Sequence, residues 1–275
     1  MVLATNIASM SVSFQLAETS SRMQVSVERL GTGLRIKKAQ DDPAGNAIAD
    51  GLRMQANTTR QGLDNSTTAV AMLQIADKAM QQQSEVIDSL KSNIISALNA
   101  TYDSTQLEIP SAVIERLISH IDEIASQTSF AGMNLLQKSS SDDSFAELFS
   151  FAVDSELTID SSGSIRSNSK GLGLDGLMGG DLTKDDLRNG LSIVDNALSK
   201  LSEFRSEYGS LQQQIESSMR TLMSQQTNMR LSESVIRDVD FVKEYATLSQ
   251  AILTYKAGSF ALTQANLSKE SVLDI

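Results

Sequence analysis

Apolar residues recur along most of this chain in alternating steps of three and four residues, the spacing of one face of an α-helix. The first such stripe starts at Leu3, slips near residues 20–24 and ends at Leu34. A second runs from Ala47 to Leu98, which predicts a helix of about fifty residues, or roughly 75 Å. A single helix of that length is marginal in water, so we expect a partner helix along its whole length.

Two further helices are predicted downstream. The third has an apolar stripe over residues 114–124, with Pro110 in its first turn, where the missing N–H costs nothing. The fourth starts at Thr183, whose spacing to Asp186 resembles a capping box, and its stripe covers residues 187–229. Because the fourth helix matches the second in length, we expect these two to pack antiparallel.

The segments between these helices have the character of loops and short strands. A loop-like stretch covers residues 37–46 and includes Pro43, and a break covers about residues 99–108. Residues 137–181 are rich in Ser and Gly, and apolar residues with period two predict one or two short hairpins there. The alternating residues are Phe149, Phe151 and Val153, then Leu157 and Ile159.

The last helical segment, residues 235–267, is apolar on more than one face. Between Tyr245 and Ser268 its only charged residue is Lys256. A helix that is apolar on several faces must be buried on several faces, and one N-terminal helix cannot cover them all. The remaining faces therefore await other copies of the chain or a different partner. The predicted interface residues are Leu3, Ile7, Met10, Phe14, Leu30, Leu34, Phe241, Tyr245, Leu248, Ile252, Leu253, Tyr255, Phe260 and Leu262.

Composition narrows the possible functions. Hydrophobic residues make up 40% of the 275 residues but aromatic residues only 4%, with no Trp and two Pro, which suits long helices. The formal charge of −11 argues against a nucleic-acid partner, because phosphate binding needs clustered Lys and Arg. The sequence has no run of eighteen apolar residues, so we expect no membrane-spanning helix. It also lacks the basic segment followed by an apolar core that is typical of a cleaved signal peptide. The absence of Cys excludes disulfides and thiolate chemistry.

No constellation of residues predicts an enzyme, a cofactor site or a metal site. His120 is the only histidine and lies in no zinc-binding motif. Asp41 and Asp42 lack the alternate-ligand spacing of a calcium loop and are better explained as a turn and helix cap. The glycines of residues 171–180 are not followed by the Lys and Ser or Thr of a phosphate loop.

Three groups of motifs, in order along the chain, resemble the bacterial flagellin family. Near the N-terminus they are Glu28-Arg29-Leu30, Gly33-Leu34-Arg35-Ile36, Asp41-Asp42 and Ala44-Gly45. In the middle they are Thr128, Phe130, Gly132 and Leu135-Leu136, and near the C-terminus Arg237-Asp238, Asp240-Phe241 and Gln264-Ala265-Asn266. Each motif alone is weak, but their shared order at both ends of the chain makes the resemblance strong.

The resemblance implies a structural subunit of the extracellular flagellar filament. Such a subunit is exported unfolded by a type III apparatus with a chaperone, and polymerises with other copies beneath a cap protein, next to hook-junction proteins. The resemblance also implies an inner coiled-coil assembly domain of residues 1–42 and 236–275. An outer helical rod would then comprise residues 43–235, with the insert at about 137–181 on its surface.

A family segment sensed by a Toll-like receptor reads Leu-Gln-Arg-Val-Arg-Glu-Leu, and its ungapped counterpart in this chain is degenerate. The corresponding residues are 87–93, including Ile87, Ser89, Leu90, Lys91 and Asn93, with Ser89 in place of an arginine. Serine cannot make the several directed bonds of a guanidinium. We therefore expect poor receptor activation.

The sequence thus predicts a mostly α fold, a long antiparallel helical bundle or coiled coil with a small β-hairpin region in the middle of the chain. A filament subunit is the favoured function. The alternatives are a hook–filament junction protein, which shares the terminal motifs, and a helical binding module that does not polymerise.

Overall fold

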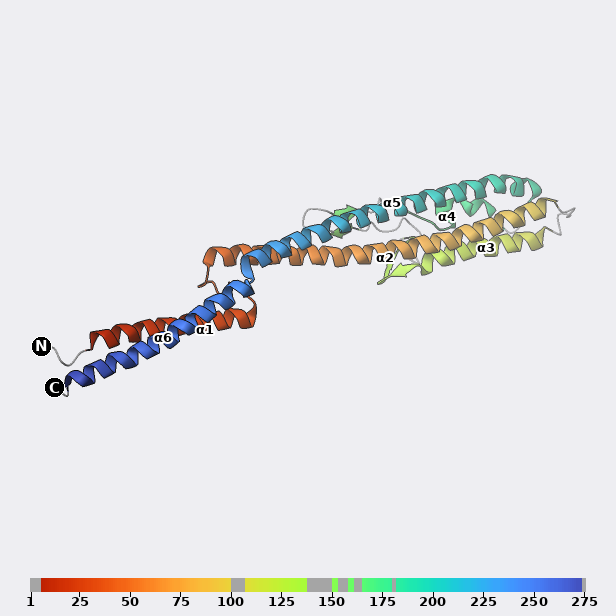
Figure 1. Ribbon diagram of the computed structural model, residues 1–275. Coiled ribbons are helices and arrows are strands. Elements are labelled where there is room, and N and C mark those ends of the chain that lie inside the picture. The colour runs from red at the N-terminus through yellow and green to blue at the C-terminus, as the bar shows by residue number, and fades with distance from the viewer. Residues whose placement is uncertain are drawn as a thin grey trace. The chain divides into compact units, whose positions relative to one another are not determined.

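The computed structural model describes residues 6–99, 107–137, 150–152, 158–160, 165–179 and 182–273 (Figure 1). The chain divides into two compact units. We call residues 1–56 with 227–275 the terminal unit, and residues 57–226 the central unit. The predicted assignment of residues 1–42 and 236–275 to an inner assembly domain concerns the polymer, and stays a prediction.

The terminal unit is built on two antiparallel helices, α1 (Ile7–Thr32) and α6 (Phe241–Leu273). The Asn6 side chain accepts a bond from the N–H of Ser9, which caps α1, and donates to the carbonyl of Ala265 at 3.1 Å. Helix α1 ends at Gly33, whose φ of 73° lies in the left-handed region that favours glycine. The slip in the apolar stripe does not interrupt α1.

Helices α2 (Pro43–Asn99) and α5 (Lys184–Arg237) are the two longest helices of the chain, and each passes through both units. The prediction that α2 starts near Ala47 and that Pro43 lies in a loop is wrong, because Pro43 is the first residue of the helix. Proline is well suited to that position, and the Asp42 carboxylate accepts the N–H of Gly45 at 3.0 Å. The predicted capping box of α5 is confirmed, since Thr183 and Asp186 bond each other in both directions.

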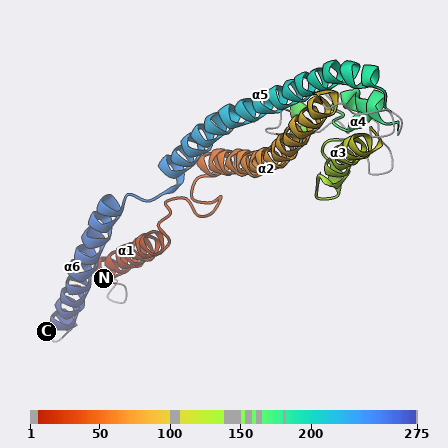
Figure 2. The ribbon, with the colours of Figure 1, turned by 90° about the vertical axis from the view of Figure 1, so that its right-hand side faces the viewer.

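In the central unit α2 and α5 pack antiparallel, and α3 (Glu108–Gln127) lies along α2 (Figure 1 and Figure 2). Two ion pairs fix the register, Lys91 with Asp195 at 2.6 Å and Arg205 with Asp77 at 2.9 Å. The stripes predicted from the sequence supply the core between these helices. Its fully buried large side chains include Met80, Ile87, Leu90, Ile94, Ile114, Ile118, Ile121, Val194, Leu201, Tyr208 and Ile215.

Two short hairpins are present among the described residues. Strands β3 (Ser150–Ala152) and β4 (Thr158–Asp160) pair antiparallel with Phe151 opposite Ile159, as the alternating pattern predicted. The other three residues of that pattern lie outside the described part of the chain. Strands β1 (Ser129–Phe130) and β2 (Met133–Asn134) were not predicted. Their turn has two positive φ angles, 51° at Ala131 and 86° at Gly132, as tight hairpin turns require.

The second half of the insert belongs to the core and not to the surface. Here α4 (Ser169–Leu172) and the 3₁₀ turn η2 (Leu174–Leu177) follow one another. Ile165, together with Leu172, Leu174 and Leu177 of these elements, is almost completely buried. The Asp122 carboxylate of α3 accepts both the N–H and the hydroxyl of Ser169, at 2.6 and 2.8 Å, and so ties the insert to the bundle.

Candidate assembly surface of the terminal unit

Helix α1 faces α6 with a mixture of polar side chains and the apolar side chains of Val12 and Leu16. Thr19 and Ser26 are the buried residues of α1, and the Thr19 hydroxyl is satisfied by the Gln15 carbonyl at 2.7 Å. On the other side, a Cβ added to Gly258 would lie 3.0 Å from Leu16, so the helices meet closely at this point. A hollow of about 270 Å³ remains beside it, lined by Val12, Gln15, Leu16, Thr19, Thr254, Ala257, Gly258 and Ala261.

Three large apolar side chains in the first turns of α1 lie on the face turned away from α6. Ile7 is 74% exposed, Phe14 is 72% exposed, and Met10 is also exposed. The described first part of the predicted stripe, Ile7 to Phe14, therefore lies on the outer face of the pair. These side chains are not buried within the single subunit, so they are available for contact with another chain.

The other predicted interface residues divide into two groups, apart from Leu3, which lies outside the described residues. Exposed residues of α6 are Phe241, Tyr245, Leu253, Tyr255 and Phe260. Residues half-buried within the terminal unit are Leu30, Leu34, Leu248, Ile252 and Leu262. The single subunit thus leaves large apolar side chains of α6 uncovered, with Leu253 and Phe260 the most exposed of these predicted residues.

Sequence reasoning missed several exposed apolar residues of the terminal unit. Val242 of α6 and Val235 at the end of α5 are each 82% exposed, and Ile48, Leu231 and Val27 are exposed as well. Val27 and Val242 lie on stripes visible in the sequence. Val235 and Ile48 lie near helix ends, where a short apolar pattern gives no signal of which face is covered.

The two units differ in charge. The terminal unit contains eleven Lys and Arg and eleven Asp and Glu, so its formal charge is zero. The whole formal charge of −11 lies in the central unit. Because a neutral unit carries no net self-repulsion, copies of the terminal unit can pack together without that electrostatic cost.

The turn that follows α1 is ordered by exposed charged groups. The Asp41 carboxylate accepts the backbone N–H of Lys38 at 2.9 Å and that of Lys37 at 3.0 Å, and these bonds lower the pKa of Asp41. The Lys37 ammonium lies 2.6 Å from Glu28 and lowers the pKa of that carboxyl. The carboxyl groups of Asp41 and Glu28 are therefore ionised near neutral pH, where their bonds order the turn.

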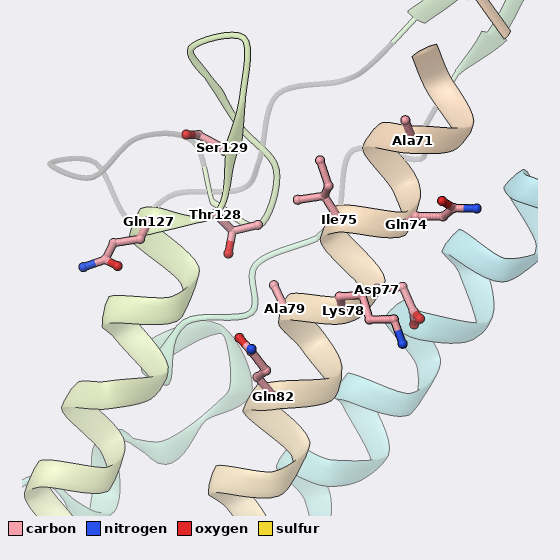
Figure 3. A pocket seen from close by; sticks show the side chains of 10 residues that line it. All are labelled: Ala71, Gln74, Ile75, Asp77, Lys78, Ala79, Gln82, Gln127, Thr128 and Ser129. Carbon is pink, nitrogen blue, oxygen red and sulfur yellow. The ribbon is translucent and has the colours of Figure 1, made fainter. Parts of the chain in front are cut away.

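A groove of about 750 Å³ in the central unit is the other candidate site (Figure 3). Ile75 and Ala79 of α2 lie on one side, and Thr128 and Ser129 face them from beyond the end of α3. Its one carboxylate, Asp77, is already paired with Arg205 at 2.9 Å.

Among the described residues, no group of three His, Cys, Asp or Glu could hold a metal ion. No helix in the described part of the chain is long and apolar enough to cross a membrane.

The segment aligned with the receptor-sensed motif lies on α2. Ile87 and Leu90 are fully buried in the core, Ser89 is exposed, and Asn93 is half-buried. Lys91 is engaged with Asp195. Ser89, which replaces an arginine of the motif, thus faces solvent.

Comparison with known proteins identifies the family. The sequence profile of the bacterial flagellin N-terminal helical region matches residues 3–141, and that of the C-terminal helical region matches residues 191–275. Flagellin FlaB2 of Treponema pallidum is 23% identical over 285 residues, covering 100% of this chain and 99% of that protein. Flagellin of Bacillus subtilis is 27% identical over 297 residues, covering 98% of each.

Two solved structures share the fold. The crystal structure of Bacillus cereus flagellin has a TM-score of 0.50 and 20% identity, covering 62% of this chain and 94% of that one. A structure described as a flagellar hook-associated protein from Vibrio parahaemolyticus has a TM-score of 0.61 and 11% identity, covering 72% and 99%. These identities show the fold alone, whereas the profiles match both terminal regions. The chain therefore belongs to the bacterial flagellin family and is a structural, non-enzymatic subunit that polymerises in the extracellular flagellar filament.

Proposed function

We propose that this subunit assembles by burying the exposed apolar faces of α1 and α6 against neighbouring copies. The observation that carries the proposal is the exposure of Ile7, Phe14 and Phe260, each between 72% and 76%, on a unit without net charge. No other element in the described part of a single copy covers these side chains. Burial of apolar surface contributes about 25 cal/mol per Å², so several such side chains together favour association strongly.

The contact is heterologous, with different patches meeting on the two copies, because a two-fold contact of one patch with itself closes into a dimer and cannot extend a filament. A heterologous contact that does not close into a ring gives a helical polymer. In that polymer residues 1–42 and 236–275 form the inner coiled-coil domain, and residues 43–235 form the outer rod. The half-buried residues Leu30 and Leu248 complete the interface at the edges of the α1–α6 pair, whereas Leu34 bridges to Asp238 within the subunit.

The partners before assembly are those of an exported flagellin. The chain is exported unfolded, and an export chaperone covers its apolar terminal segments until it leaves the cell. It then folds at the filament tip beneath a cap protein, and the first copies join hook-junction proteins. The absence of cysteine supports this route, because an unfolded chain without thiols cannot be trapped by disulfides on the way.

Deletion of residues 253–275 tests the proposal. The truncation removes Leu253, Tyr255 and Phe260 but leaves the central unit intact. We expect a soluble subunit that retains the helices of the central unit by circular dichroism and forms no filaments in negative-stain electron micrographs. Normal filaments from the truncated chain would refute the proposal.

The same micrographs of the full chain separate the alternatives. Long helical filaments are the expected result. Rings or short caps would favour a hook–filament junction protein; a structure described as a flagellar hook-associated protein has a similar fold. Monodisperse particles at high concentration would favour a helical binding module.

A further inference from the structure

Arg237, the last residue of α5, bonds to several parts of the terminal unit at once. Its guanidinium donates to the carbonyl of Ile36 at 3.3 Å, to Asn46 at 3.2 Å and to Asp50 at 3.3 Å. Its own carbonyl accepts the N–H of Arg35 at 2.7 Å. The residue thus bridges the α1–α2 connection, the first turns of α2 and the end of α5.

The two connections also pair with each other beside this residue. Leu34 and Asp238 form an antiparallel bridge, and the N–H of Val239 donates to the carbonyl of Gly33 at 2.9 Å. The Arg237 side chain is only 12% exposed, so its bonds are shielded from water. A planar guanidinium can hold three acceptors in fixed directions, which an ammonium cannot.

We propose that Arg237 is a positioning residue for filament assembly. It lies outside the exposed apolar faces, and it fixes the direction in which the α1–α6 pair leaves α2 and α5 within the terminal unit. The apolar faces are then held in one orientation before the subunit adds to the polymer. This inference rests on the proposed assembly through those faces. A subunit whose α1–α6 pair is already ordered loses less conformational entropy when it associates, so it binds the filament end more tightly.

Replacement of Arg237 does not leave a carboxylate without a partner. Asp50 still receives bonds from Arg53 and from Asn46, both at 2.9 Å. Glu233, which lies 3.7 Å from Arg237, also lies 3.2 Å from Arg230. An Arg237→Gln subunit is therefore expected to fold with the helices unchanged.

The experiment measures the critical concentration, the free-subunit concentration in equilibrium with filaments, for the full chain on wild-type filament seeds. Arg237→Gln is compared with Arg53→Gln, a control that removes a more exposed guanidinium from the same Asp50 carboxylate. Each subunit's helix content is measured by circular dichroism. We expect Arg237→Gln to raise the critical concentration roughly tenfold, and Arg53→Gln to change it less than about threefold.

A redox-switched rescue separates positioning from general stability. In the Arg237→Gln chain, Leu34→Cys with Asp238→Cys places a disulfide across the bridge, where paired Cβ atoms lie within bonding reach. Leu16→Cys with Gly258→Cys is the matched crosslink between α1 and α6, away from the junction. Both close loops of more than 200 residues, so both restrict the unfolded chain about equally. The natural chain has no Cys, so each disulfide is the only one.

Each outcome of this comparison decides the inference. We expect the bridge crosslink to restore near-wild-type assembly when oxidised and not when reduced, and the α1–α6 crosslink to restore none. Equal rescue by both crosslinks, wild-type assembly by Arg237→Gln, or loss of helix content in that variant would overturn it. If the wild-type subunit fails to extend seeds, the proposed function fails, and not this inference alone.

Discussion

Truncation of Phe260 to alanine is the most direct single-residue perturbation of the proposed interface. Phe260 is 76% exposed in the subunit, so most of its apolar surface is still available for burial in the polymer. Full burial of a phenylalanine side chain contributes up to about 3 kcal/mol, and three quarters of that is about 2 kcal/mol. Since 1.4 kcal/mol changes an equilibrium constant tenfold, Phe260→Ala should raise the critical concentration about 30-fold.

The assay sediments filaments grown on wild-type seeds and measures the subunit left in solution. The matched control is Ile109→Ala, because Ile109 is 75% exposed but belongs to α3 of the central unit. Its truncation should leave the critical concentration unchanged within about threefold. A change of less than threefold for Phe260→Ala, or an equal change for both variants, would refute the reasoning that exposure in the terminal unit marks the interface.

Three further predictions concern stability, pH and the receptor. Tyr208→Phe removes the buried hydrogen bond from the hydroxyl to the Leu135 carbonyl and should lower the free energy of unfolding by about 1–3 kcal/mol. Urea-induced unfolding measures this, and an unchanged unfolding midpoint would contradict it. The pKa of Asp41 is lowered in the folded chain, so its stabilisation of the turn is present above the unfolded carboxyl value and lost as pH falls below about 4. Protection factors of the two N–H groups bonded to it should fall there, and Asp41→Asn should remove this pH dependence. Purified subunit should activate a Toll-like receptor reporter cell poorly, because Ser89 replaces an arginine, and strong signalling would contradict that.

The long helices could be predicted because their apolar periodicity persists over many turns. Their ends were harder to predict, as Pro43 shows. A proline near aspartates is typical of a loop, but it also fits the first turn of a helix when Asp42 supplies the cap. The short elements α4 and η2 were missed because four residues are too few to show a period. They form because Leu172 and Leu174 are buried against the bundle.

The candidate interface could be predicted as a set of residues but not as a surface. Periodicity groups Ile7, Met10 and Phe14 on one face of α1, but it does not say which molecule covers that face. The structure shows that α6 does not cover it, because the buried residues of α1, Thr19 and Ser26, lie on another face. Arg237 could not have been found from charge alone, because its acceptors come from residues about 200 positions away in the sequence.

The central claim is that the outer faces of α1 and α6 become buried between copies in the filament. Hydroxyl-radical footprinting of free subunits and of washed filaments measures this side chain by side chain. The account predicts strong protection of Phe14 and Phe260 in the filament, while Ile109, equally exposed in the subunit, keeps its reactivity. Equal reactivity of Phe14 and Phe260 in subunit and filament would contradict the account.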